Sequence, residues 1–194
     1  MIYFLRGKVY ELSPIYAIIE VLGVGYYVGL SLQTFRSLRQ GEEVFLYTKQ
    51  IFREDTHLLF GFSTSVERDL FNLLISVNGV GPSSALIMLS SLSNEEICSA
   101  IRSDNALLLQ KVKGIGTKTA ERIIIDLRDK VVNFGNNDVQ SSGVQYNKIK
   151  REALSALEVL GIQKRVSEKI ADKIIKQNPQ TDVEELIKQI LKDI

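Results

Sequence analysis

The sequence predicts a multidomain protein: a small β barrel, a helical domain, a flexible linker and a three-helix domain. Three observations point to this order. Residues 1–62 alternate apolar and polar side chains as strands do, whereas residues 64–132 change to helical spacing. Residues 133–147 are mostly Asn, Gln, Ser and Gly, too poor in apolar anchors to fold, before helical spacing returns. We therefore expect domains at 1–63, 64–132 and 148–194, with a linker at 133–147.

The first domain is predicted to hold five short strands rich in Val, Ile, Tyr and Phe, with turns between them. The expected strands are 1–11, 15–22, 25–32, 43–51 and 57–62. A short helix is expected at 34–38, between the third and fourth strands. This order suggests a closed barrel of the OB type. Periodicity by itself favours a small antiparallel β domain more strongly than that particular barrel.

The remaining apolar spacing is helical. After a first helix that follows residue 64, we expect helices at 84–89, 95–101, 106–112 and 117–131, then at 148–160, 164–176 and 182–194. Ser93 with Glu96, and Thr181 with Glu184, have the spacing of capping boxes at helix starts. The last three helices form a unit of about 48 residues, near the lower limit for independent folding. Such a unit usually docks on a partner.

The composition excludes several classes of protein. The net charge is +1, and basic and acidic residues balance within each of the three segments, so global charge does not attract nucleic acid. No apolar run is long enough to span a membrane, and the start has no signal-peptide pattern. The single cysteine, Cys98, excludes an internal disulfide and fits the cytoplasm, where we expect the protein to be.

Two similar glycine turns carry the chemistry of the second domain. VNGVGPSSA occupies 77–85 and VKGIGTKTAER occupies 112–122, and each opens a helix. Two glycines one residue apart permit positive φ and bring bare backbone close to a ligand. The helix that follows has unpaired N–H groups and a dipole that favours an anion, and phosphate fits best. Lys118 and Arg122 lie four apart on the second helix and add charged donors.

Other interpretations of the turns are weaker. A single Gly-x-Gly often just links packed helices, but two copies in one unit favour phosphate binding. GIGTKT lacks the spacing of a nucleotide-binding P-loop and follows a helix, not a strand. With one histidine (His57) and one thiol (Cys98), the chain has little material for a metal site or a catalytic triad. We expect Cys98 to be a small buried side chain and His57 to be structural or surface-exposed, and we expect no catalytic residue, metal or cofactor.

A series of segments in one order resembles the RuvA family, the Holliday-junction-binding subunits of the bacterial branch-migration machine. The segments are FLRGKV (4–9), IEVLGVGYYV (19–28), REDTHLLFGF (53–62), NGVGPSSAL (78–86) and GIGTKTAERII (114–124). The likeness is close across 1–132 and looser beyond. It implies an OB barrel, two helix-hairpin-helix motifs and a UBA-like three-helix domain. It also implies sequence-independent junction binding in recombination, DNA repair and the SOS response.

The resemblance also implies roles for particular residues. Backbone phosphate would be bound by Gly79, Val80, Gly81, Ser83, Gly114, Ile115, Gly116, Thr117, Lys118 and Arg122. The family often has lysine where this chain has Ser83 and Thr117, so we expect a shallower salt dependence of DNA binding. Glu54 and Asp55 match an acidic pin at the junction centre, where clustered carboxylates repel phosphate and disfavour a straight duplex.

The partners implied are four-way junction DNA, three further copies of the chain in a tetramer, with one or two tetramers per junction, and the RuvB ATPase. RuvB would dock on residues 148–194, and the RuvC resolvase would join a larger complex. The alternative is a helix-hairpin-helix DNA-processing enzyme, a glycosylase or nuclease. Asp126 and Asp129 are its nearest acidic candidates, but they look like ordinary helix charges. A pure protein-docking adaptor would not need the duplicated turn.

Overall fold

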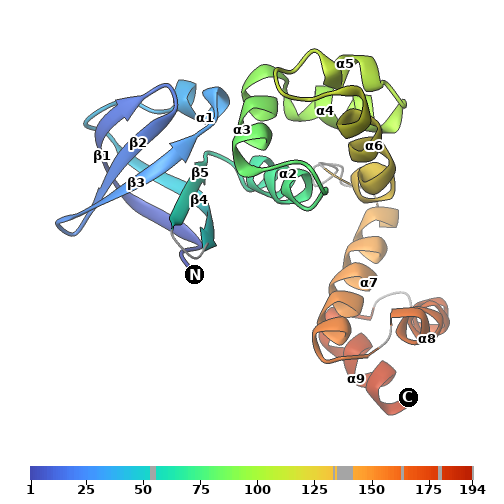
Figure 1. Cartoon of the computed structure of the whole chain (residues 1–194). Helices are drawn as coiled ribbons and strands as arrows, with labels where there is room; N and C mark the ends of the chain where they lie inside the picture. Colours follow the sequence, from blue (N-terminus) through green and yellow to red (C-terminus); the bar gives the residue numbers. More distant parts are fainter. Residues whose placement is uncertain (53–55, 133, 135–141, 163, 179–180, 194) are drawn as a thin grey trace. The chain divides into compact units, whose positions relative to one another are not determined.

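The computed structural model describes residues 1–52, 56–132, 134, 142–162, 164–178 and 181–193 (Figure 1). It divides into two compact units, residues 1–135 and residues 136–194. No helix in these described ranges is long and apolar enough to cross a membrane.

The first unit begins with a closed five-stranded barrel (Figure 1). Its elements are β1 (Phe4–Ser13), β2 (Tyr16–Val21), β3 (Val24–Leu30), α1 (Leu32–Ser37), β4 (Glu43–Phe52) and β5 (His57–Phe62). Neighbouring strands follow the order β1-β2-β3-β5-β4, and the ladder between β1 and β4 closes the ring. The predicted barrel with a helix between the third and fourth strands is confirmed.

The β3–β5 ladder is the parallel one, and it is short. It pairs Gly29 with Phe60 and Leu30 with Gly61, whereas the other ladders are antiparallel. Glycine is required here by close packing, because a Cβ on Gly61 would lie 2.5 Å from Cγ1 of Val28. The strands alternate buried and exposed positions, so their inward residues fill the barrel.

The helical part of the first unit contains five helices: α2 (Ser65–Ile75), α3 (Pro82–Ser91), α4 (Asn94–Arg102), α5 (Ala106–Gln110) and α6 (Thr117–Val131). The capping box predicted at Ser93 and Glu96 is confirmed, since the Ser93 hydroxyl accepts the Glu96 amide at 3.1 Å and the Glu96 carboxylate accepts the Ser93 amide at 2.7 Å. In contrast, α3 and α6 start at glycine N-caps with no side-chain cap.

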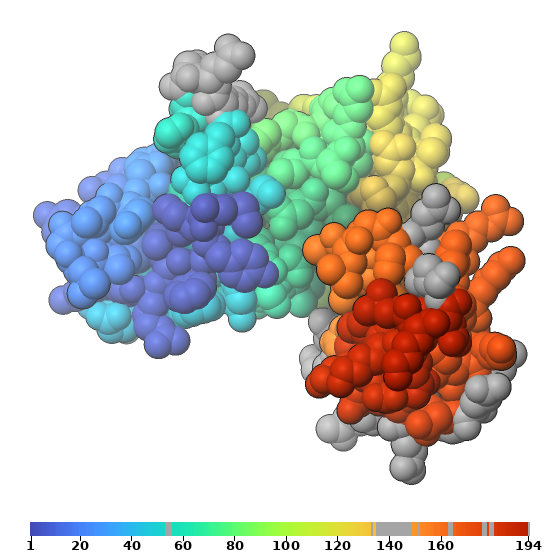
Figure 2. Space-filling view, turned by 90° about the horizontal axis from the view of Figure 1, so that it is seen from below, coloured from blue at the N-terminus to red at the C-terminus, as the bar shows by residue number. Residues whose placement is uncertain are grey.

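One apolar core serves the helices and the last strand of the barrel. Phe60 and Phe62 of β5 belong to the same buried cluster as the helices, and the Phe62 and Phe71 rings lie 5.0 Å apart. Figure 2 shows the blue and cyan surface of the barrel running without a break into the green surface of the first helices. Cys98 is buried in this core, as expected.

The second unit is a bundle of three helices, α7 (Ser142–Val159), α8 (Lys164–Gln177) and α9 (Val183–Asp193), around a small apolar core. Two expectations are corrected here. The helix predicted over 148–160 begins earlier, at Ser142, within the segment predicted as linker. The cap of α9 is Asp182, which accepts the Glu185 amide at 2.8 Å, and the Thr181 hydroxyl has no hydrogen-bond partner among the described residues.

Candidate nucleic-acid interface

The two glycine turns have the same backbone geometry. The first glycine of each is left-handed, with φ of +93° at Gly79 and +90° at Gly114, a region that favours glycine. The second glycine is extended, with φ of −85° at Gly81 and −83° at Gly116, and it is the N-cap of α3 or α6. A Cβ at any of the four would meet nothing within 4 Å. Each turn therefore presents bare backbone to open space.

The residue between the glycines anchors each turn. Val80 and Ile115 are 5% and 4% exposed and lie in the common helical core. Their amides donate within the turn, Val80 to the Val77 carbonyl at 3.0 Å and Ile115 to Val112 at 3.1 Å. The sequence-based expectation gave these two amides to phosphate; the structure gives each an acceptor inside its own turn. The turn is thus held rigid by its middle residue.

The amides left for an anion are those of the glycines and of the first residues of the helices. Among the described residues, no backbone hydrogen bond uses the amide of Gly79, Gly81, Gly114 or Gly116. The first amides of α3 and α6 also lack partners, as at any helix start, and the helix dipole adds positive potential there. A compact anion such as phosphate matches these convergent donors.

The two turns differ in donor strength. α3 begins with Pro82, which has no N–H, so the first turn presents one amide fewer than the second. Ser83 follows and is exposed. At the second turn, Thr117 supplies both an amide and a hydroxyl, and the hydroxyl lies 3.3 Å from Oε1 of Gln110. Lys118 follows on the exposed face of α6.

Arg122 joins the two turns. Its Nη1 donates to the carbonyl of Asn78, next to Gly79, at 3.3 Å, although the residues are 44 positions apart. The sequence placed Arg122 with the second turn, because it lies on the helix that this turn opens. The structure brings its guanidinium to the first turn, whose own segment carries no cation. Arg122 therefore supplies the first turn with charge.

Two further cations lie at the second turn and were missed by sequence reasoning. Lys111 and Lys113 are exposed just before Gly114. Their position beside the turn could have indicated them, but the motif was interpreted from its first glycine onward. No sequence pattern indicated Gln110, which accepts from the Thr117 hydroxyl, or Asn78, whose carbonyl accepts from Arg122. Gln110 is an ordinary polar residue, and Asn78 lies 44 positions from Arg122.

The described residues contain no cluster of three or more His, Cys, Asp or Glu side chains suited to a metal ion. Burial raises the pKa of the Cys98 thiol, so this side chain is poorly suited to act as a nucleophile. His57 is exposed and packs edge-on against Phe52, with ring centroids 4.9 Å apart. The surface around the turns is organised for binding by backbone and cationic donors.

Comparison with known proteins covers nearly the whole chain. The RuvA N-terminal domain model matches residues 1–61, the SAM-like helix-hairpin-helix tandem model matches 71–129, and the RuvA C-terminal domain model matches 149–194. A protein of Christiangramia forsetii is 47% identical over 195 residues, covering 100% of both chains. Relatives from Flavobacterium psychrophilum and Cytophaga hutchinsonii are 45% and 41% identical, covering 100% and 99% of both chains respectively. The chain belongs to the RuvA family.

These three RuvA relatives are each named Holliday junction branch migration complex subunit RuvA. The helix-hairpin-helix tandem match, residues 71–129, contains both glycine turns and Arg122. The match to the RuvA N-terminal domain, residues 1–61, contains Glu54 and Asp55, the predicted acidic pin. Both carboxylates lie outside the described residues, so their pin role stays a prediction.

Proposed function

We propose that this chain binds four-way Holliday junctions by their shape and serves branch migration together with the RuvB ATPase. The observation that carries the proposal is the pair of glycine turns with matching backbone geometry on one shared core, each open to an anion. Such turns bind the phosphate backbone and do not contact the bases, so binding is independent of DNA sequence. The names of the full-length relatives support the same activity.

Repetition compensates for weak single contacts. The chain has a net charge of only +1, so one copy gains little from long-range attraction. Four copies in a tetramer multiply the two turns fourfold, and linked sites bind far more tightly than one. The mass of the complex with and without a synthetic four-way junction distinguishes one tetramer from two, and a monomeric complex would refute this assembly.

The phosphate donors in this proposal are the glycine and helix-side amides of both turns, with Ser83, Thr117, Lys118 and Arg122 around them. Because Ser83 and Thr117 are neutral, the logarithm of affinity should fall less steeply with salt than in a relative with lysines there. Replacing both by Lys should steepen the slope by about 0.9 for each phosphate newly neutralised. An unchanged slope would place these side chains away from DNA.

We assign Glu54 and Asp55 to the centre of the junction, where their charges disfavour a duplex that runs straight through. Glu54→Gln with Asp55→Asn should raise duplex affinity relative to junction affinity. Glu42→Gln with Glu43→Gln, two exposed glutamates at the start of β4, is the matched control for loss of two adjacent charges. An unchanged ratio in the paired variant argues against the pin.

The rival function is DNA processing by a helix-hairpin-helix glycosylase or nuclease. The decisive experiment is a titration of the purified chain against a four-way junction and a duplex of equal length, followed by a check for cleavage. We expect preference for the junction and intact DNA. Cutting or base release without any partner would establish the rival function. Equal affinity for the junction and the duplex would refute the proposed preference for junctions.

Residues 148–194 are proposed to dock on RuvB, with RuvC joining a larger complex in the cytoplasm. The second unit has its own core, so it is suited to act as a separate module. A chain ending at residue 134 should still bind the junction but should lose capture of RuvB. If the shortened chain retains RuvB, the docking site lies in the first unit.

A further inference from the structure

A polar contact joins the barrel to the helical part of the first unit. Its donors come from the start of α1, which belongs to the barrel domain. Its acceptors come from the C-terminal end of α3. The Leu32 amide donates to the Ser90 hydroxyl at 3.0 Å, and the Gln33 side-chain amide donates to the Leu92 carbonyl at 2.8 Å. Hydrogen bonds have fixed directions, so this contact defines an orientation in a way that apolar packing does not.

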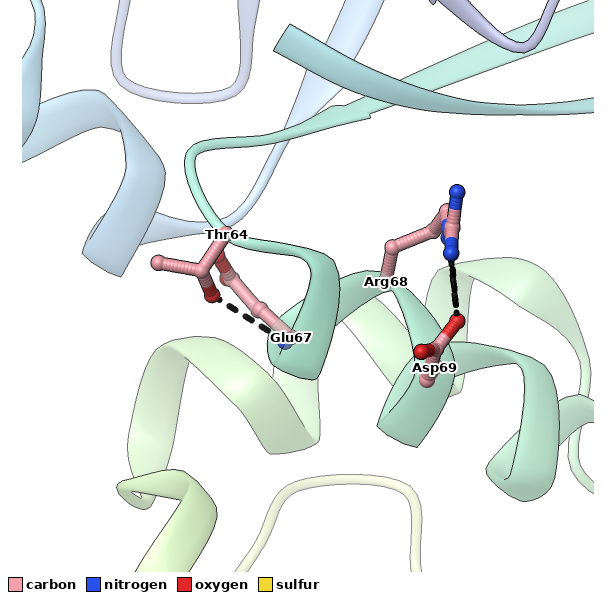
Figure 3. Close-up of polar contacts among 4 residues, drawn as sticks. All are labelled: Thr64, Glu67, Arg68 and Asp69. Carbon is pink, nitrogen blue, oxygen red and sulfur yellow. Dashed lines mark hydrogen bonds and ion pairs between the residues drawn. The ribbon is translucent and has the colours of Figure 1, made fainter. Parts of the chain in front are cut away.

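The centre of the contact is a buried carboxylate, Glu67. It lies in the first turn of α2, and its backbone amide donates to the Thr64 hydroxyl at 3.2 Å (Figure 3). The residue is 2% exposed. One carboxylate oxygen accepts from the Ser31 hydroxyl, and the other accepts from the Thr34 hydroxyl at 2.7 Å. Both donors belong to the barrel domain.

The two hydroxyls are themselves oriented by backbone amides. Ser31 Oγ accepts the Thr34 amide at 3.1 Å, and Thr34 Oγ1 accepts the Ser63 amide at 3.0 Å. Because each oxygen accepts an N–H, its own proton is directed at Glu67. Two relays therefore converge on one side chain, and only a group with two acceptor oxygens satisfies both. A glutamine would turn an NH2 group toward one of the hydroxyl protons.

We propose that Glu67 is a positioning residue that fixes the barrel on the helical domain and so sets the distance between the barrel and the two glycine turns. This inference rests on the proposed function for its consequence. A duplex arm needs only the turns, whereas a branch point needs the turns and the barrel at a set separation. Loosening the contact therefore costs discrimination of the junction while duplex binding is kept.

The contact is tested first without DNA. Spin labels on Val24→Cys of β3 and Leu107→Cys of α5 report the separation of barrel and helices, since both positions are exposed and Cys98 is buried. Labelled chain is diluted with excess unlabelled chain, so that each assembly carries one pair. Glu67→Gln should widen the distribution of distances. Glu95→Gln, an exposed glutamate on another helix, is the matched control and should leave it unchanged.

The DNA measurement follows on the same variants. The ratio of junction affinity to duplex affinity should fall by about fivefold or more in Glu67→Gln, with duplex affinity unchanged. An unaltered distance distribution in a folded Glu67→Gln protein overturns the proposal. If that variant does not fold, Thr34→Val decides, because it removes one donor and leaves Ser31 in place. A wild-type chain without junction preference would refute the proposed function only, since the distances are measured without DNA.

Discussion

Gly116→Ala separates phosphate binding from folding. Gly116 has φ of −83° and ψ of 171°, which alanine adopts without strain, and its Cβ would meet no atom within 4 Å. Alanine restricts the unfolded chain, worth about 0.4–1 kcal/mol in stability, but it is a poorer N-cap than glycine by a similar amount. The free energy of unfolding should therefore change by less than about 1 kcal/mol.

Binding should respond differently, because the added methyl group projects into the open space at the turn, where we place the phosphate. A hydrogen bond to a charged group contributes about 1.5–3 kcal/mol, so losing one costs about tenfold or more in affinity per turn. Fluorescence anisotropy with a labelled junction measures this, and thermal unfolding measures stability. Wild-type affinity in Gly116→Ala would refute phosphate binding at this turn.

Two comparisons sharpen the result. Gly114→Ala must adopt φ of +90°, so it should lose about 1–2 kcal/mol of stability as well as binding. Gly81→Ala is the equivalent change at the first turn. It should cost less affinity than Gly116→Ala, because Pro82 already leaves that turn with fewer amides. Equal losses at the two turns would contradict the difference in donors.

Three further predictions follow from individual side chains. Arg122→Gln and Lys118→Gln should each make the salt slope shallower by about 0.9 per lost phosphate contact, but only the Arg122 variant should speed hydrogen exchange in the first turn, which its guanidinium holds. Leu22 is 97% exposed with φ of 50°, so Leu22→Gly should stabilise the protein by about 0.5–1 kcal/mol, seen as a higher melting temperature. Burial raises the pKa of Glu67 and outweighs the opposite effect of its hydroxyl donors. The contribution of Glu67 to the free energy of unfolding should therefore be full below the unfolded pKa and decline as pH rises through the folded pKa. Unfolding curves measured over a pH series should show this decline in the wild-type protein but not in Glu67→Gln.

Local patterns were enough for much of the fold. Strand alternation gave β5 with the bounds observed, His57–Phe62, and helical spacing gave Thr117–Val131 for α6. The start of α6 directly follows Gly116, whose effect on the backbone is local. The start of α7 was less accurate, because it depends on how far the helix extends beyond its core residues.

The site was predictable only where it is local. The glycine pairs determine their own backbone, so their positive φ values and their place at helix starts followed from the sequence. The bond from Arg122 to Asn78 depends on how two helical segments pack, and no spacing rule reports it. Glu67 was equally hidden, since a glutamate in a first helical turn normally faces water. Its burial follows from partners more than 30 positions away.

The short parallel ladder between β3 and β5 has a consequence for how the protein folds and melts. It joins strands that are not neighbours in sequence, so it forms after the local β1–β2, β2–β3 and β4–β5 pairs. Only Ser63 and Thr64 separate β5 from α2, and the amide of Ser63 supports the relay to Glu67. Pairing of β5 with β3 and docking of α2 are therefore one cooperative event. Heat should melt residues 1–135 in a single transition, although the sequence divides them into two domains.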